Sequence, residues 1–112
     1  MRQPEAGNKV IVGWLSLNEG AESAFDAIIP AYLAECRAEP ECRFFEMMRT
    51  AENPRTVLVC ECFDSETAHE LHLQRPHVKA MFTELSRIAG VGHFQNMVIA
   101  KVTPDSADFS KM

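Results

Sequence analysis

The chain has 112 residues, of which 46% are hydrophobic and 24% are charged, and its formal net charge is -5 at pH 7. This composition is typical of one soluble globular domain. The acidic balance, without a Lys/Arg cluster, argues against nucleic-acid binding, and no apolar run approaches the ~20 residues of a membrane-spanning helix. The polar N-terminus lacks the apolar segment of a signal peptide, so we expect a cytoplasmic protein that does not bind membranes.

The first half of the chain predicts a strand, a helix and a second strand. Residues 9–17, KVIVGWLSL, are apolar and β-branched enough for a strand. Gly13 within it is typical of a place where another segment approaches the backbone closely. Apolar residues recur at spacings of three and four over residues 25–36, which predicts an amphipathic helix with a bend at Pro30. A second strand is expected over residues 42–50.

A nearly unbroken apolar run over residues 57–63 predicts a third strand that is buried on both faces. The turn-forming residues before it predict a hairpin with the second strand. If the hairpin is centred on the turn, Phe45 lies opposite Glu61 and Arg43 lies opposite Phe63.

The rest of the chain predicts a broken helix and a last strand. Asp64 or Ser65 can cap the start of the helix, and Pro76 interrupts it. Gly90-Val91-Gly92 is expected to form a loop. The last strand is then expected over residues 93–102.

This order, β-α-β-β-α-β, predicts an α+β, ferredoxin-like fold with a four-stranded antiparallel sheet and both helices on one face. The other face is also apolar, so we expect a second copy to cover it, sheet against sheet, in a homodimer. We expect a single domain over residues 9–102, a flexible lead over 1–8 and a flexible tail over 103–112.

The cysteines give no sign of a metal site. Cys36, Cys42, Cys60 and Cys62 lack the paired spacing that metal sites use. We interpret them as small buried apolar side chains in a reducing compartment.

Two segments resemble the antibiotic biosynthesis monooxygenase family, and are most like its quinol monooxygenase branch. They are residues 61–65, ECFDS, and residues 72–80, HLQRPHVKA. The resemblance extends over residues 9–102 and implies a dimeric α/β barrel. The chain departs from the family at Glu39-Pro40-Glu41, where Glu-Pro-Gly is usual. It also has Glu61-Cys62-Phe63 in place of Glu-x-Trp, which removes an indole N–H.

The resemblance implies a function. Members of this branch are said to oxygenate quinols or phenols with O2 and without a metal or flavin. It therefore implies a cofactor-independent monooxygenase whose substrate, a small hydroxylated aromatic, lies between the sheet and the helices. The haem-degrading relatives of the family carry their axial histidine at a position that falls at Phe82 here, which argues against haem degradation.

Such chemistry needs a base that converts the substrate into an electron-rich anion in a dry pocket. His72 is the first candidate for the base, or for orienting the substrate hydroxyl. The alternative is a helix-end histidine bonded to the backbone near Pro76. Glu61 is the second catalytic candidate, and its alternative is an ion pair with Arg43 or Arg49.

Five further residues are candidates for binding the substrate, and for each the alternative is a plain core position. They are Tyr32, Phe45, Met47, Phe63 and Phe82. His69 and His77 are expected to be exposed.

Two other functions stay open. A non-catalytic protein could use the same cavity to bind an apolar ligand. An isomerase of a small phosphorylated signalling molecule, a function found elsewhere in the superfamily, would need a cationic phosphate site. Only Arg43, Arg49 and Arg75 are candidates for that site.

Overall fold

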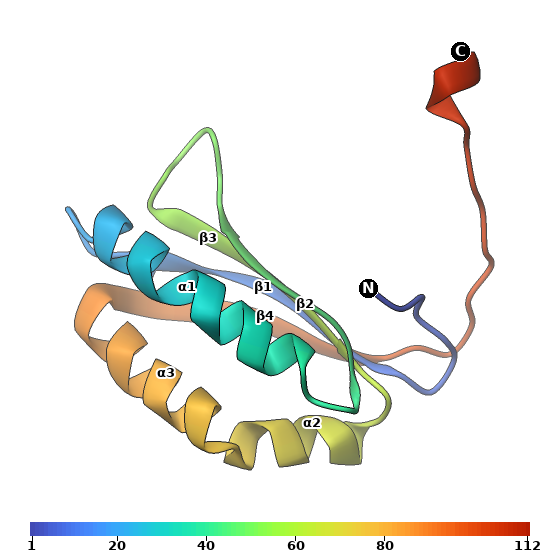
Figure 1. The fold of residues 1–112 in the computed structure, drawn as a ribbon, viewed down its shortest axis with the longest axis horizontal. Coiled ribbons are helices and arrows are strands. Elements are labelled where there is room, and N and C mark those ends of the chain that lie inside the picture. The colour runs from blue at the N-terminus through green and yellow to red at the C-terminus, as the bar shows by residue number, and fades with distance from the viewer.

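Three helices lie against one face of a four-stranded antiparallel sheet in the computed structural model, which describes residues 1–112 (Figure 1). The elements in chain order are β1 (Lys9–Leu17), α1 (Glu22–Arg37), β2 (Cys42–Arg49), β3 (Thr56–Phe63), α2 (Glu66–Gln74), α3 (Pro76–Ile88), β4 (Ala89–Val98) and a terminal 3-10 turn, η1 (Phe109–Lys111). None of the helices combines the length and the apolar character needed to cross a membrane.

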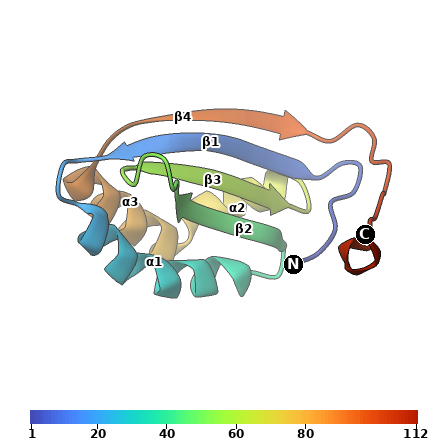
Figure 2. The same cartoon turned by 90° about the horizontal axis from the view of Figure 1, so that it is seen from above.

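The order of strands across the sheet is β2-β3-β1-β4, with β2 and β4 at the edges (Figure 2). All neighbouring strands are antiparallel. This is the predicted ferredoxin-like arrangement, and it leaves only the helix-covered face available for a closed core within one chain.

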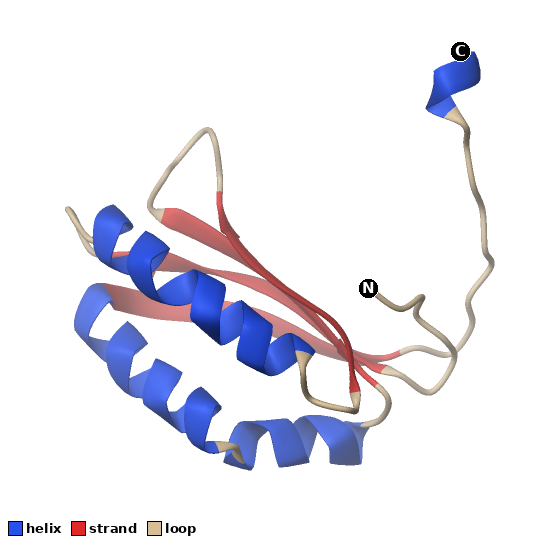
Figure 3. Cartoon of the chain, viewed as in Figure 1, coloured by secondary structure: helices blue, strands red, loops and turns tan.

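The helix boundaries follow from local chemistry. Ser65 caps α2, because its Oγ accepts a hydrogen bond from the backbone N–H of Ala68 at 3.1 Å. α2 ends at Gln74, and Pro76 is the first residue of α3, where a missing N–H costs nothing. The short loop between these two helices is visible in Figure 3. Pro30 does not interrupt α1, which continues through it as one helix with the proline on its exposed side.

The hairpin register is partly as predicted. Phe45 lies opposite Glu61, which confirms that pairing. The register shifts between Cys42 and Phe44, however, so that Cys42 rather than Arg43 lies opposite Phe63. An extra residue of this kind cannot be read from the length of a hairpin loop.

The prediction for the last strand was wrong by four residues at each end. β4 begins at Ala89 and ends at Val98, so the Gly-Val-Gly segment belongs to the strand. Gly92 pairs with Leu15, and the pairing extends almost the whole length of β1. Glycine residues predict a loop only weakly, because strand pairing with a neighbour can hold them in extended backbone.

The core lies between the sheet and the helices. Its largest fully buried side chains include Phe25, Phe45 and Phe63. The opposite face of the sheet is different: Trp14 and Leu58 are 48% and 47% exposed, although both are large apolar residues. Within one chain the outer side of β3 is therefore covered only at its end, at Cys62, and the predicted burial on both faces does not extend to Leu58.

The two ends of the chain differ in their contacts with the rest of the domain. The N-terminal segment contacts the body, because the backbone N–H of Arg2 bonds to the carbonyl of Arg43 and Asn8 is buried. The last residues, beyond β4, lead away from the sheet and end in η1 at a distance from the body (Figure 1).

Candidate active site

A cavity of about 310 Å³ lies between the sheet and the helices. It is lined by Ile11, Leu15, Tyr32, Phe45, Met47, Val59, Glu61, His69, His72, Leu73, Phe82, Leu85, Phe94 and Asn96. Phe82, Phe94 and Leu73 are themselves partly exposed and mark its open side, toward α3 and β4. A mostly apolar cavity with a few convergent polar groups is the usual form of a small-molecule site.

His72 is the polar group at the centre of this site. It lies in the last turn of α2 and is 2% exposed. Its Nδ1 lies 3.0 and 2.9 Å from the two carboxylate oxygens of Glu39. Because a carboxylate only accepts hydrogen bonds, Nδ1 carries the proton and donates it to Glu39. Nε2 is therefore left with a free lone pair on the side of Glu61, 3.8 Å away.

Burial lowers the pKa of His72, against the opposing effect of the hydrogen bond to Glu39. The neutral imidazole is thus favoured. A neutral histidine with one nitrogen fixed as a donor and the other free is the form that a general base requires. The predicted alternative, a histidine bonded to the backbone near Pro76, is wrong.

Glu39 bonds to several polar side chains of the site, although the sequence analysis named it only in the Glu39-Pro40-Glu41 segment and not as a site residue. It follows α1 in the loop to β2 and is 5% exposed. Besides His72, it accepts a hydrogen bond from Nε2 of His77 at 2.7 Å. Its Oε1 also lies 3.0 Å from Nε of Arg75. His77, expected to be exposed, is instead held in this cluster with 16% of its side chain exposed.

Glu61 points from the middle of β3 into the same cavity, and its side chain is 13% exposed. The predicted alternative, an ion pair with an arginine, is wrong. Arg43 binds Asp64 and Arg49 binds Asp26. Without a cationic partner, burial raises the pKa of Glu61 to about 8, and the charge of the nearby carboxylate adds to the effect. This shift favours the neutral acid form of Glu61 at pH 7.

The structure brings most of the remaining predicted site residues together. Tyr32, Phe45, Met47 and Phe82 line the cavity. Burial raises the pKa of Tyr32, which keeps its hydroxyl protonated. Phe63 does not line the cavity; it packs against His72 with the ring centroids 4.6 Å apart.

His69 is the other residue whose predicted exposure was wrong. It lines the cavity beside His72, and their ring centroids lie 6.0 Å apart. Burial lowers the pKa of His69 to about 4, so it is uncharged at neutral pH. Its spacing of three residues from His72 on one helix placed both on the same face, and that signal was available in the sequence.

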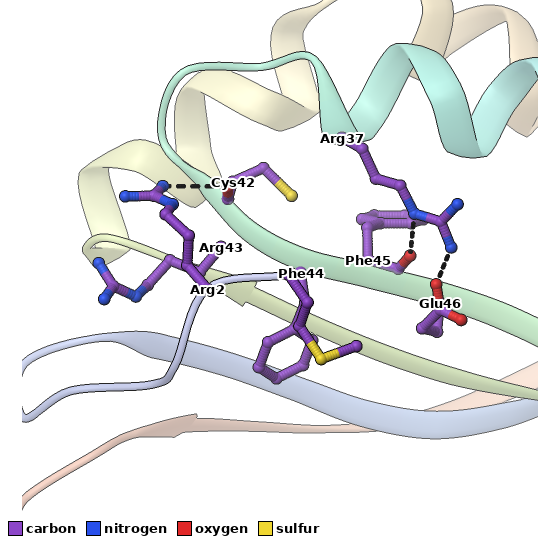
Figure 4. Close-up of a pocket in the computed structure, with 8 residues that line it drawn as sticks. Arg2, Arg37, Cys42, Arg43, Phe44, Phe45 and Glu46 are labelled. Atoms are coloured by element: carbon purple, nitrogen blue, oxygen red, sulfur yellow. Dashed lines mark hydrogen bonds and ion pairs between the residues drawn. The ribbon is translucent and has the colours of Figure 1, made fainter.

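A second cavity, of about 410 Å³, lies beside β2 and contains three arginines (Figure 4). Arg37 donates to the carbonyl of Phe45 at 3.2 Å and pairs with Glu46. Arg2 donates to the carbonyl of Cys42 at 3.0 Å, and the third arginine binds an aspartate. Because each of these arginines already has a hydrogen-bond or ion-pair partner, the cavity has no unpaired arginine that could bind an anion.

The fold and the site define a class: small ferredoxin-like proteins with an apolar cavity between the sheet and the helices. Within that class the chain belongs to the antibiotic biosynthesis monooxygenase family, whose family model matches residues 10–84, more than half of the chain. A comparison with curated proteins found no match.

Solved structures share the fold. A protein of Deinococcus radiodurans that is named for this family is 16% identical, with a TM-score of 0.80 over 88% of this chain and 99% of that one. A protein named likewise from Nitrosomonas europaea is 13% identical, with a TM-score of 0.75 over 80% and 95%. A Mycobacterium tuberculosis protein is 19% identical, with a TM-score of 0.73 over 90% and 99%. At these identities the likeness establishes the fold alone.

Proposed function

We propose that the protein is a monooxygenase that oxidises a small hydroxylated aromatic, a quinol or phenol, with O2 and without a cofactor. The observation that carries the proposal is the state of His72. Its Nδ1 is fixed as a donor to Glu39, and its Nε2 is free beside Glu61 in an apolar cavity. Family membership supports the reaction class.

The cavity fits a substrate of this kind. Its volume of about 310 Å³ is at the lower end of ligand sites, which suits one or a few fused rings. Phe45, Phe82 and Phe94 supply aromatic walls. Apolar walls also keep water away from the reacting anion.

In the proposed reaction, Nε2 of His72 takes the proton of the substrate hydroxyl, and the O–H bonding electrons stay on the oxygen. The electron-rich anion then reacts with O2, one of whose atoms forms a C–O bond with the ring to give a peroxide. Glu61, protonated below its pKa of about 8, gives its proton to the outer oxygen of that peroxide. The resulting carboxylate takes the ring C–H proton, the C–H electrons form the second C=O bond as the O–O bond breaks, and the leaving hydroxide takes the proton from His72 to become water. In total a phenol and O2 give a quinone and water, so no external reductant is needed.

Oxygen uptake tests this proposal directly. Purified protein, treated with a chelator, is expected to consume O2 above the autoxidation rate with at least one member of a panel of quinols and polyphenols. His72→Ala should lower kcat by about 10²–10⁴-fold, the contribution typical of a general base. His93→Ala, at an exposed position on β4, is the matched control. A full rate in His72→Ala would show that the base is wrongly assigned.

Glu39 is proposed as the positioning residue for that base. Glu39→Gln offers an amide N–H to Nδ1 and so favours the tautomer with the proton on Nε2. We expect kcat to fall at least about tenfold with little change in KM. Glu41→Gln, which also removes a carboxylate beside Arg75 but not one bonded to His72, is the control.

The apolar lining favours a second candidate, a protein that binds an apolar ligand without turnover: ten of the 14 lining residues are hydrophobic. Thermal stabilisation by the panel compounds, without oxygen uptake, would support it. The isomerase has less support, because no arginine or lysine lines the cavity. Arg43, Arg49 and Arg75 all pair with carboxylates instead.

A further inference from the structure

Four side chains of different chemistry meet behind the cavity, and no part of the proposed reaction needs all of them. Cys36 lies in the last turn of α1, and Glu39 follows three residues later. His72 lies in the last turn of α2, and His77 is the second residue of α3. Each can offer one ligand atom, and these atoms all lie within 4.8 Å of one another.

We propose that Cys36, Glu39, His72 and His77 form a site for one divalent transition-metal ion of the zinc type. A sulfur, two imidazole nitrogens and one carboxylate oxygen form a ligand set that Zn²⁺ prefers and that Ca²⁺ and Mg²⁺ do not. Four protein ligands close the coordination shell, which is typical of a structural or regulatory ion rather than a catalytic one.

The distances require only small adjustments: the widest pairs of ligand atoms, up to 4.8 Å apart, must close and the shortest pairs must open. Tetrahedral Zn²⁺ holds its ligand atoms about 3.3–3.6 Å apart, given bonds of about 2.0–2.3 Å. The imidazole nitrogens that face Glu39 already lie 2.7–3.0 Å from its oxygens. Cys36, Glu39 and His72 are buried, so water would not complete the shell in their place.

The charges of the site balance when the ion is bound. Burial raises the pKa of Cys36, so the empty site holds a thiol. Binding would break its S–H bond, release that proton to solvent and form a metal–sulfur bond, with no change of oxidation state. One thiolate and one carboxylate then neutralise the dication. Arg75, 3.0 Å from Glu39, therefore faces no net positive charge, and its guanidinium is also held by Glu41.

A bound ion would change the state of His72. Nδ1 must give its lone pair to the metal, so the imidazole proton moves to Nε2 on the cavity side. Nε2 would then donate a hydrogen bond instead of taking a proton. If the proposed function is right, the metal-loaded protein is inactive and a chelator restores it; this consequence alone rests on the proposed function.

Titration of the metal-free, reduced full chain with Co²⁺, in the absence of substrate, tests the site. We expect one Co²⁺ per chain, with visible bands of a tetrahedral ion and a near-ultraviolet thiolate-to-cobalt band, both displaced by Zn²⁺. Cys36→Ser should abolish the thiolate band, and His77→Asn should weaken binding by at least about 10–100-fold. Cys60→Ser, on β3 and outside the cluster, should change neither.

The absence of a thiolate band in the unmodified chain would overturn the proposal. A band that survives in Cys36→Ser, or that is lost in Cys60→Ser, would overturn it equally. His77→Asn changes a partly exposed side chain, so it keeps the test valid if Cys36→Ser fails to fold. The cobalt signals are measured without substrate, whereas oxygen uptake is measured on metal-free protein. A failure of the proposed metal site can therefore be distinguished from a failure of the proposed reaction.

Discussion

The buried carboxylate of Glu39 binds three side chains that lie further along the chain, at the junction of α2 and α3. His72 and His77 donate to it, and Arg75 pairs with it. A buried carboxylate must be satisfied by such partners, so the loop before β2 is tied to the junction of α2 and α3. The same bonds fix the tautomer of His72, so that stability and the proposed chemistry depend on one residue.

Glu61 gives a prediction at the residue scale. Its pKa is about 8 in the folded metal-free protein, above the ordinary value of 4.5, so the folded state binds more protons between these two pH values. The contribution of this carboxyl to the free energy of unfolding should therefore fall as pH rises from about 4.5 to 8, whereas the lowered pKa values of His69 and His72 make their contributions rise toward about pH 6.5. Glu61→Gln should remove that decline and be more stable than the unmodified chain at pH 9, by on the order of 1–3 kcal/mol.

Denaturant unfolding at several pH values measures both proteins. Glu46→Gln, a change on the same sheet at a carboxylate paired with Arg37, is the control and should keep the decline. If the curves of Glu61→Gln and the unmodified chain stay parallel from pH 5 to pH 9, the carboxyl is not neutral in the folded state.

At the scale of elements, the contact of β1 with β4 depends on Gly13. A Cβ at this position would overlap the carbonyl oxygen of His93 and lie 2.9 Å from Cα of Phe94. Both are backbone atoms that cannot move without separating the strands. The close approach predicted at this glycine is therefore present.

Gly13→Ala is expected to destabilise the fold by about 2 kcal/mol or more, as overpacking against a backbone does. Gly90→Ala is the matched control, since its Cβ would meet nothing closer than the carbonyl oxygen of Ser16 at 3.9 Å. Thermal unfolding of the two variants measures the difference. Equal melting temperatures would show that the strands can separate without cost.

The elements also show what could be predicted from the sequence. Periodicity and turn residues located the four strands and the α-helices but not η1, and the Phe45–Glu61 pairing followed from the hairpin. The register shift at Arg43 and the start of β4 could not be predicted, because both depend on how neighbouring strands pair. Glu39 was missed for a similar reason. Its partners lie 33 and 38 residues away, and an acidic residue beside a proline looks like an exposed loop residue.

At the scale of the whole molecule, one face of the sheet is left without a covering layer. Four large apolar side chains on this face or at its edge are close to half exposed: Trp14, Met48, Leu58 and Met97. Scattered exposed apolar residues are ordinary, but a group on one sheet face is not. We propose that a second copy of the chain covers this face, which would also bury the outer side of β3.

Sedimentation of the purified protein should then show a dimer at micromolar concentration. Leu58→Glu places a charge in the proposed interface and should weaken dimerisation by at least about tenfold. Leu71→Glu, at a similarly exposed position on α2, should leave the dimer intact. A monomer in the unmodified protein, or equal effects of the two substitutions, would contradict the proposal.

The most direct test of His72 as a base is the absorption spectrum of a bound phenol under argon, where no oxidation follows. The phenol should be a nitrophenol whose acidity is close to that of imidazole, because burial lowers the pKa of His72 and an ordinary phenol would keep its proton at equilibrium. At a pH below the pKa of the free compound, the unmodified protein should bind a larger fraction of it as the phenolate than His72→Ala does, because Nε2 can take the proton. Equal phenolate fractions in the two proteins would contradict the role of His72.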